Sequence, residues 1–172
     1  KLPTGSGVPP KLPANPFDCN LRSKGDLVKE TGNNSHLGLV VDRIWSKRSG
    51  EIEDCKNTKC AKCAYGNYAG AFYYSKGTGK ITTAKSGDFQ HSEGQLIDAI
   101  GRQDLITDLF SERVPCGDKY QGCSRLLMER SNWQVACNCQ AINVCSFGVF
   151  WPQKDPDASA IQVAARWKAL YG

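Results

Sequence analysis

From residue 67 to the end of the chain, β-rich and helical segments alternate, and this order restricts the folds that the chain can adopt. Two β-rich runs flank the sequence KGTG at 76–79, which is typical of a hairpin. The next segments are expected to be a helix, a strand, a helix, two strands and a helix, at 91–102, 104–114, 123–131, 132–138, 142–151 and 157–172. Helices that alternate with strands cover the faces of a sheet, so the sequence predicts a three-layer α/β domain.

The part of the chain before this alternation is less regular. Residues 1–18 hold most of the eight prolines and show no periodicity, which predicts a Pro-rich linker before a domain at 19–172. The linker lacks the apolar core of a signal peptide, and we interpret the chain as a module of a longer protein. The apolar run 36–45 is expected to be a buried strand or a turn of helix, and the Lys- and Cys-rich stretch 46–66 a loop or irregular insertion.

Composition sets broad limits on function. The 172 residues are 40% hydrophobic and 23% charged, which is ordinary for a globular domain that can bury a core. No run of about 18 apolar residues is present, so we expect no membrane-spanning helix. A net charge of +5 is compatible with a polyanionic partner and equally with solvated surface lysines.

Nine cysteines exclude a complete set of intramolecular disulfides, because the number is odd. They are Cys19, Cys55, Cys60, Cys63, Cys116, Cys123, Cys137, Cys139 and Cys145. Metal ligation and buried thiols compete with disulfides in a chain of this length. Cys55, Cys60 and Cys63 could hold a structural zinc with Cys19 as the fourth ligand; the alternative is a lysine-rich loop with free thiols or one disulfide.

One of the two histidines stands at the start of the segment 91–102, and a glutamate follows it two positions later. A catalytic zinc needs three protein ligands, and histidine and thiolates are preferred. Thiolates are favoured at the start of a helix, and the sequence VPCGDKYQGC at 114–123 leads into such a helix. His91, Cys116 and Cys123 are therefore candidate zinc ligands. Glu93 could lie beside the metal and carry protons without binding it.

This combination of His-x-Glu at one helix and Pro-Cys…Cys at the next resembles the zinc-dependent nucleobase deaminases. Within that superfamily, HSEGQ after a hairpin and the Pro-rich start are most similar to bacterial polymorphic-toxin deaminases, over roughly residues 66–151. The resemblance implies a cytidine deaminase-like α/β/α fold with a mixed five-stranded central sheet. It also implies Zn²⁺ held by His91, Cys116 and Cys123, with Glu93 as the general acid and base.

One departure from the family pattern concerns the spacing of the cysteines. Six residues separate Cys116 from Cys123, where the usual signature has two. Gly117 and Gly122 could let this longer loop leave and return. Cys137 or Cys139 is the alternative third ligand.

Substrate contacts are expected close to these ligands. Tyr120 lies between the two cysteines, and Ser86 precedes the histidine. Tyr74 on the hairpin could stack on an extruded base. Strand alternation should turn Tyr73 away from Phe72 and Tyr74, and core packing is the alternative role for these rings.

The resemblance implies an enzyme that converts cytosine to uracil in DNA, with single-stranded DNA favoured because a duplex must first extrude the base. It implies a monomeric effector domain, secreted and delivered into the cytoplasm of a competing bacterium, with a cognate immunity protein and no membrane partner. Double-stranded DNA, RNA or a free nucleotide is the alternative substrate. A non-catalytic zinc-stabilised nucleic-acid-binding module is the alternative class, and a metal-free disulfide-linked effector is disfavoured by the odd cysteine. Glu93 favours the enzyme, because a structural site has no use for a carboxylate that does not bind metal.

Overall fold

The computed structural model describes residues 19–33, 35–58, 64–87, 89–117, 121–150 and 156–172. Its elements in chain order are β1 (Cys19–Asn20), α1 (Lys24–Asn33), α2 (Ser35–Thr58), β2 (Tyr68–Ser75), β3 (Thr78–Lys85), α3 (Ser92–Ala99), β4 (Leu105–Arg113), α4 (Cys123–Ala136), β5 (Asn143–Val149) and α5 (Pro156–Tyr171). The strands form one five-stranded sheet in the order β1-β5-β4-β2-β3. β2 is antiparallel to β3 and β4, whereas β4, β5 and β1 are parallel. The predicted mixed five-stranded α/β fold is therefore confirmed.

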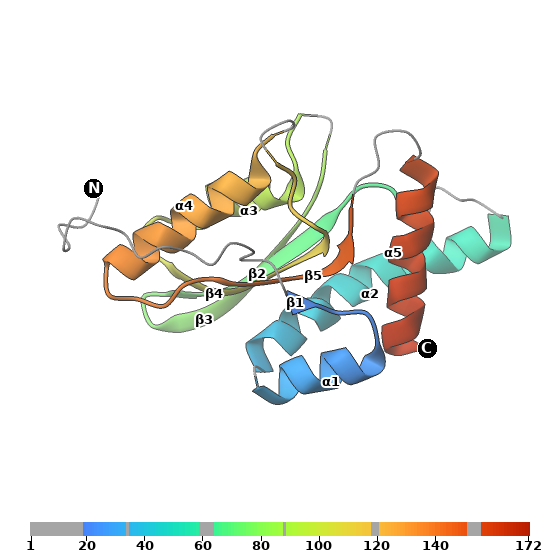
Figure 1. Cartoon of the computed structure of the whole chain (residues 1–172), viewed down its shortest axis with the longest axis horizontal. Coiled ribbons are helices and arrows are strands. Elements are labelled where there is room, and N and C mark those ends of the chain that lie inside the picture. Colours follow the sequence, from blue (N-terminus) through green and yellow to red (C-terminus); the bar gives the residue numbers. More distant parts are fainter. Residues whose placement is uncertain (1–18, 34, 59–63, 88, 118–120, 151–155) are drawn as a thin grey trace.

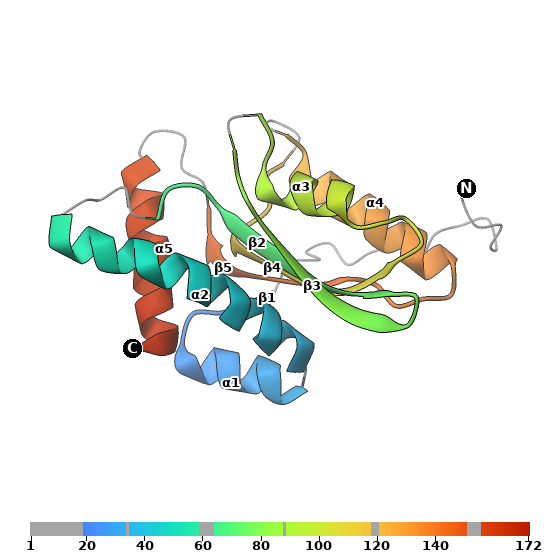
Figure 2. The ribbon, with the colours of Figure 1, turned by 180° about the vertical axis from the view of Figure 1, so that it is seen from behind.

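Helices cover both faces of this sheet, and alternation along β2 divides its side chains between them (Figures 1 and 2). Ala69, Ala71 and Tyr73 pack in the cluster that contains side chains of α3 and α4. Phe72 and Tyr74 pack in the other cluster, which contains side chains of α2 and α5. The sequence prediction that Tyr73 turns away from its two neighbours is confirmed, and each face of the sheet has its own apolar core.

The long helix α2 corrects the expectation for the first third of the chain. The run 36–45 is helical, and the helix continues to Thr58 through residues expected to form a loop. Val40, Ile44 and Arg48 recur every four positions and are all fully buried against the sheet. Burial of this face outweighs the turn-forming residues that made the segment look irregular. α1 was not anticipated at all.

The second half of α4 is a further correction. Residues 132–136 were expected to form a strand, but α4 runs unbroken from Cys123 to Ala136. The side chain of Gln134 is the reason that the helix fits here. Its Oε1 accepts the N–H of Ile106 at 2.9 Å, and its Nε2 donates to the carbonyl of Ile106 at 2.8 Å. Gln134 thus satisfies backbone groups at the start of β4. Because this polar residue stands between Trp133 and Val135, the sequence alternates between apolar and polar residues as a strand does.

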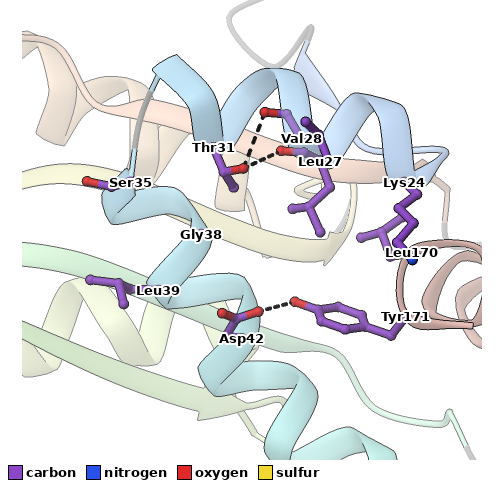
Figure 3. Close-up of a pocket in the computed structure, with 10 residues that line it drawn as sticks. All are labelled: Lys24, Leu27, Val28, Thr31, Ser35, Gly38, Leu39, Asp42, Leu170 and Tyr171. Atoms are coloured by element: carbon purple, nitrogen blue, oxygen red, sulfur yellow. Dashed lines mark hydrogen bonds between the residues drawn. The ribbon is translucent and has the colours of Figure 1, made fainter.

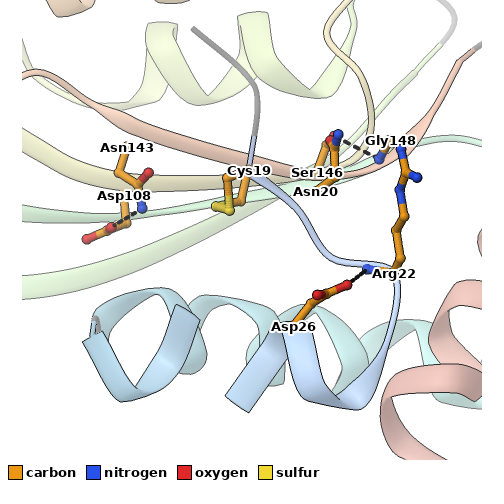
Figure 4. The surroundings of a disulfide bond; sticks show 9 residues. Cys19, Asn20, Arg22, Asp26, Asp108, Asn143, Ser146 and Gly148 are labelled. Carbon is orange, nitrogen blue, oxygen red and sulfur yellow. Dashed lines mark hydrogen bonds between the residues drawn. A yellow bond between two sulfur atoms is a disulfide. The ribbon is translucent and has the colours of Figure 1, made fainter. Parts of the chain in front are cut away.

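A disulfide joins Cys19 of β1 to Cys145 of β5 (Figure 4). The two residues are direct partners in the parallel pairing of these strands, and the next link is the N–H of Leu21, which donates to the carbonyl of Ser146. The disulfide thus ties the short edge strand to the sheet. Cys19 is not available as a thiolate ligand, which corrects its proposed part in a second zinc site.

No helix among the described residues is long and apolar enough to cross a membrane. The expected linker at 1–18 lies outside the described residues, as do Cys60 and Cys63. The alternatives for the group with Cys55 therefore stay open.

Candidate metal centre

The candidate ligands come together at one end of the sheet. β3 ends there at Lys85 and β4 ends there at Arg113, and β2, which lies between them, starts at this end with Tyr68 opposite Lys85. The chain after β3 leads to His91 and α3, and the chain after β4 leads to Cys116 and α4. Sites in α/β sheets are commonly built at the carboxyl ends of strands, as this one is at the ends of β3 and β4.

The three predicted ligands form one cluster. The Sγ atom of Cys116 is 3.3 Å from Nδ1 of His91, and the Sγ atom of Cys123 is 3.4 Å from the same nitrogen. All three ligand atoms lie within 4.8 Å of one another, so they could hold a single metal ion. Among the described residues no further His, Cys, Asp or Glu joins this group. A tetrahedral ion held by these three ligands would keep one position for a water molecule or substrate.

The six-residue spacing between the cysteines is explained by the backbone at its two ends. The N–H of Gly122 donates to the carbonyl of Gly117 at 3.2 Å, so the loop closes where it leaves and returns. Gly122 has φ 66° and ψ 36°, the left-handed conformation that glycine adopts readily. Gln121 accepts the backbone N–H of His91 at 2.8 Å, which links the loop to the start of α3. This geometry bears out the expected role of Gly122, whereas the carbonyl of Gly117 is a group that any residue could supply.

The alternative ligands Cys137 and Cys139 are not near the cluster. Cys123 begins α4 and Cys137 follows its last residue, so the two lie at opposite ends of a helix about 20 Å long. Both Cys137 and Cys139 are exposed free thiols, whereas Cys123 is buried. Cys123 is therefore the third candidate ligand.

The chemistry of the donor set fits a cation. Burial, together with the nearby Glu93 carboxylate and Cys116 thiol, raises the pKa of the Cys123 thiol. A bound cation reverses this balance, because a coordinating thiol loses its proton. The backbone N–H of Cys123 also points to the sulfur of Cys116 at 3.4 Å, as a donor at the start of a helix can do for a thiolate. One imidazole nitrogen and two sulfurs are ligands that suit zinc.

Glu93 lies in the first turn of α3, is 4% exposed and faces the sheet. Its Oε1 accepts hydrogen bonds from Asn67 Nδ2 at 2.8 Å, from Ser111 Oγ at 2.7 Å and from Ser92 Oγ at 3.1 Å. Its carboxylate also interacts with the thiol of Cys123, as a hydrogen-bond acceptor and through its charge, and both interactions raise the pKa of that thiol. Glu93 is thus beside the cluster but outside the group of three ligands.

The predicted substrate residues have different outcomes. Ser86 lies next to the site, where its hydroxyl accepts the N–H of Asn67 at 2.7 Å. Tyr74 is not near the site: it packs on the α2 face beside His36 and lies roughly 20 Å along β2 from Asn67. The placement of Tyr74 corrects its proposed contact with substrate. Tyr120 lies outside the described residues.

Sequence reasoning missed the polar residues that support Glu93. Asn67 and Ser111 stand 26 and 18 positions away from it, and no local pattern marks them. The segment before Asn67 is held by two buried arginines. Arg48 Nη2 donates to the carbonyl of Gly66 at 3.0 Å, and Arg113 Nη1 donates to the same carbonyl at 2.6 Å. Burial lowers the pKa of Arg113 to about 10, against the attraction of the adjacent Glu112, so its guanidinium still carries its charge at neutral pH.

A separate hollow of about 480 Å³ lies between α1, α2 and the end of α5 (Figure 3). Its walls include exposed Val28 and Leu39, and the hydroxyl of Tyr171 donates to Asp42 across it. The hollow is on the α2 face of the sheet and does not adjoin the metal centre.

Comparisons with known proteins add no relative: no protein-family model, no curated protein and no solved structure matches this chain. The argument for function therefore depends on the geometry of the candidate metal centre.

Proposed function

We propose that this chain is a zinc-dependent hydrolase that deaminates a nucleobase. One observation carries the proposal: a buried carboxylate, Glu93, is held beside a His-Cys-Cys cluster without belonging to the ligand group. A hydrolytic deaminase requires this pair of features, because proton transfer must accompany the attack of water on the base.

His91, Cys116 and Cys123 would hold the zinc. When bound, zinc supplies Lewis acidity and activates a water molecule as a nucleophile. The carboxylate of Glu93 takes the proton that this water gives up. It passes this proton to N3 of the base as the water oxygen bonds to C4, and a second proton, from the hydroxyl group then on C4, moves to the exocyclic amine as the C4–N bond breaks. Cytosine and water thus give uracil and ammonia.

Cytosine in single-stranded DNA is the substrate that we propose. An enzyme must bring the base out of a duplex at a cost of a few kcal/mol, and a single strand avoids most of that cost. The net charge of +5 is modest, which suits a short flexible strand better than a distorted duplex. With the resemblance of the motif to toxin deaminases, this supports an effector domain that is delivered into competing bacteria and neutralised by an immunity protein.

A structural zinc site is the second candidate function. A structural site is closed by four protein ligands, whereas the described residues contribute three. A structural site also gives no reason for a buried carboxylate that is hydrogen-bonded next to the ligands. Both points favour the enzyme.

The test measures metal content and deamination together. Purified protein is expected to carry about one zinc, which His91→Ala and Cys116→Ala should remove. Glu93→Ala should keep the metal and lose the conversion of cytosine to uracil in a single-stranded oligonucleotide. Cys137→Ala, which removes an exposed thiol at the far end of α4, is the control and should keep both properties.

Three outcomes would count against the proposal. Full metal content in both ligand variants would exclude the proposed ligand set. Deamination by Glu93→Ala at the wild-type rate would exclude the role of its carboxylate. A faster reaction on the matching duplex at equal salt would replace the single-stranded substrate by double-stranded DNA.

A further inference from the structure

We infer that Asn67 is a positioning residue that fixes the orientation of the Glu93 carboxylate. This inference rests on the proposed function, since it assigns a purpose to a contact of the same site. Asn67 precedes β2 and comes from neither of the helices that supply the ligands. It therefore provides a third, independent support for the site.

The amide of Asn67 is the centre of a small polar network. Its Nδ2 lies 2.8 Å from each of three oxygens, which are Oε1 of Glu93, Oγ of Ser92 and Oγ of Ser111. These oxygens belong to α3 and β4, so one amide group connects the helix that carries Glu93 to the strand beneath it. Ser92 and Ser111 are fully buried, so bulk water does not reach these two hydroxyl groups.

Hydrogen bonds fix both the side chain and the backbone of Asn67. Its Oδ1 accepts the N–H of Arg113 at 2.8 Å, which fixes the direction of the amide and places Nδ2 toward Glu93. Its backbone N–H donates to the hydroxyl of Ser86, and its carbonyl accepts the N–H of Ser86. The carbonyl of the preceding Gly66 is held by Arg48 and Arg113. A side chain fixed in this way can impose an orientation on its partner.

The network distinguishes the two oxygens of the Glu93 carboxylate. The donors from Asn67, Ser111 and Ser92 all go to Oε1 of Glu93. This anchors Oε1 and leaves Oε2 outside the network of Asn67, Ser92 and Ser111; the thiol of Cys123 is a further hydrogen-bond partner of the carboxylate. A proton carrier needs such an arrangement, because rotation of the carboxylate would move the reactive oxygen away from water and base. Without Asn67 the hydroxyl groups remain, but each of them can turn toward another acceptor.

The experiment compares Asn67→Ala and Asn67→Asp with a matched control, Asn143→Ala. Asn67→Asp keeps the acceptor for Arg113 and loses the donating amide. Asn143 also donates its Nδ2 to a buried carboxylate, Asp108, at 3.1 Å, but it lies on β5 at the other end of the sheet. For each variant we would measure zinc content, and kcat and KM on a cytosine-containing single-stranded oligonucleotide.

Both Asn67 variants are expected to lower kcat by about tenfold to hundredfold, with KM and zinc content little changed, because only orientation is lost. Asn143→Ala should leave kcat unchanged. A kcat within twofold of wild type in both Asn67 variants would overturn the inference while the proposed function stands. A parallel rise in KM or loss of zinc would overturn it too, because it would assign Asn67 a binding or structural role.

A second measurement does not depend on activity. Asn67→Ala is made in wild-type protein and in Glu93→Ala, and the fall in melting temperature is compared. We expect a fall of roughly 3–6 °C in the first background and a clearly smaller one in the second. Equal falls would show that Asn67 does not act on Glu93. Wild-type protein that deaminates no cytosine would instead overturn the proposed function, and this thermal cycle would still decide whether the two side chains are coupled.

Discussion

Glu112 and Glu93 are both buried, but they lie on opposite faces of the sheet and have different partners. Glu112 faces α2 and α5 and accepts four hydrogen bonds: from Arg48 Nε at 2.8 Å and Nη2 at 2.6 Å, from the N–H of Tyr68 at 2.8 Å and from Trp167 Nε1 at 2.6 Å. Both of its oxygens are used, and its charge is balanced by Arg48. Glu93 lies on the other face, which α3 and α4 cover, and its Oε1 accepts from three neutral donors, Asn67, Ser92 and Ser111.

The difference indicates how a structural carboxylate can be distinguished from one that could carry protons. Burial does not separate them, because Glu112 is 0% and Glu93 4% exposed. A buried ion pair with every oxygen satisfied fixes the packing of three elements and has no free site for a proton. A carboxylate that accepts hydrogen bonds from neutral groups and lies beside two thiols can exchange protons. The face of the sheet covered by α2 and α5 carries the buried ion pair, and we call it the structural face. The face covered by α3 and α4 carries the candidate metal centre, and we call it the metal face.

The largest expected effect on stability is that of Glu112→Ala. The substitution removes the buried ionic partner of the fully buried Arg48 guanidinium, which is left with the part-exposed Glu51. Breaking a buried ion pair costs about 3–5 kcal/mol of the free energy of unfolding, which urea denaturation would measure. Lys85→Ala breaks the exposed ion pair with Glu51 and is the control, with an expected loss below about 1 kcal/mol. If the two losses were similar, Glu112 would not have the structural role described above.

Removal of the disulfide should have the second largest effect. The double variant Cys19→Ala with Cys145→Ala removes a cross-link between residues 126 positions apart, so the unfolded chain gains conformational entropy. We expect the free energy of unfolding to fall by about 2–4 kcal/mol, measured by thermal or urea unfolding. Zinc content should not change, because the disulfide belongs to the α2 and α5 face. Loss of zinc from the folded variant would contradict the division between the faces.

Gly122→Ala tests the metal face with a smaller change. A side chain at φ 66° costs about 1–2 kcal/mol, and the loop that aligns Cys116 with Cys123 must then distort. Gly77→Ala is the matched control, since Gly77 has φ 80° with open space around its Cα and lies in the hairpin turn. Both variants should lose similar stability in unfolding experiments, but only Gly122→Ala should bind zinc more weakly in a chelator competition. Equal zinc affinity in both would separate the loop from the metal centre.

The smallest effect on stability is expected for Glu93→Gln. Glutamine keeps the shape of the side chain and an oxygen that can accept from Asn67 and Ser111, so the free energy of unfolding should change by less than about 1 kcal/mol. The same substitution at Glu112 removes the charge that balances Arg48 and should cost several times more. Urea unfolding of the two variants side by side gives the comparison directly. A greater loss for Glu93→Gln would reverse the roles of the two glutamates.

The sequence predicted the metal face better than the structural face, and the reason is physical. The hairpin, α3, β4 and the ligands have local signals: turn glycines, helical spacing, Pro115, and a histidine that stands nearly alone. α2 beyond residue 46 lacks such a signal, because its buried face depends on Arg48, whose partner is 64 residues away. The anchoring of Glu93 by Asn67 was likewise invisible, since it is created only when β2 lies beside β4. What could not be predicted from the sequence are therefore the contacts between segments that lie far apart in the chain, whereas the candidate ligands could be.

The closed base of the loop between the cysteines has a consequence for how such sites are recognised. Because Gly122 donates to the carbonyl of Gly117, the positions of Cys116 and Cys123 are set at the two ends of the loop. Residues could be inserted or removed between these ends without moving either sulfur, much as a surface loop tolerates changes in length. A search pattern that demands a fixed interval between the cysteines would overlook every such variant. A pattern that instead requires a glycine, which readily adopts the left-handed conformation, directly before the second cysteine would retain them.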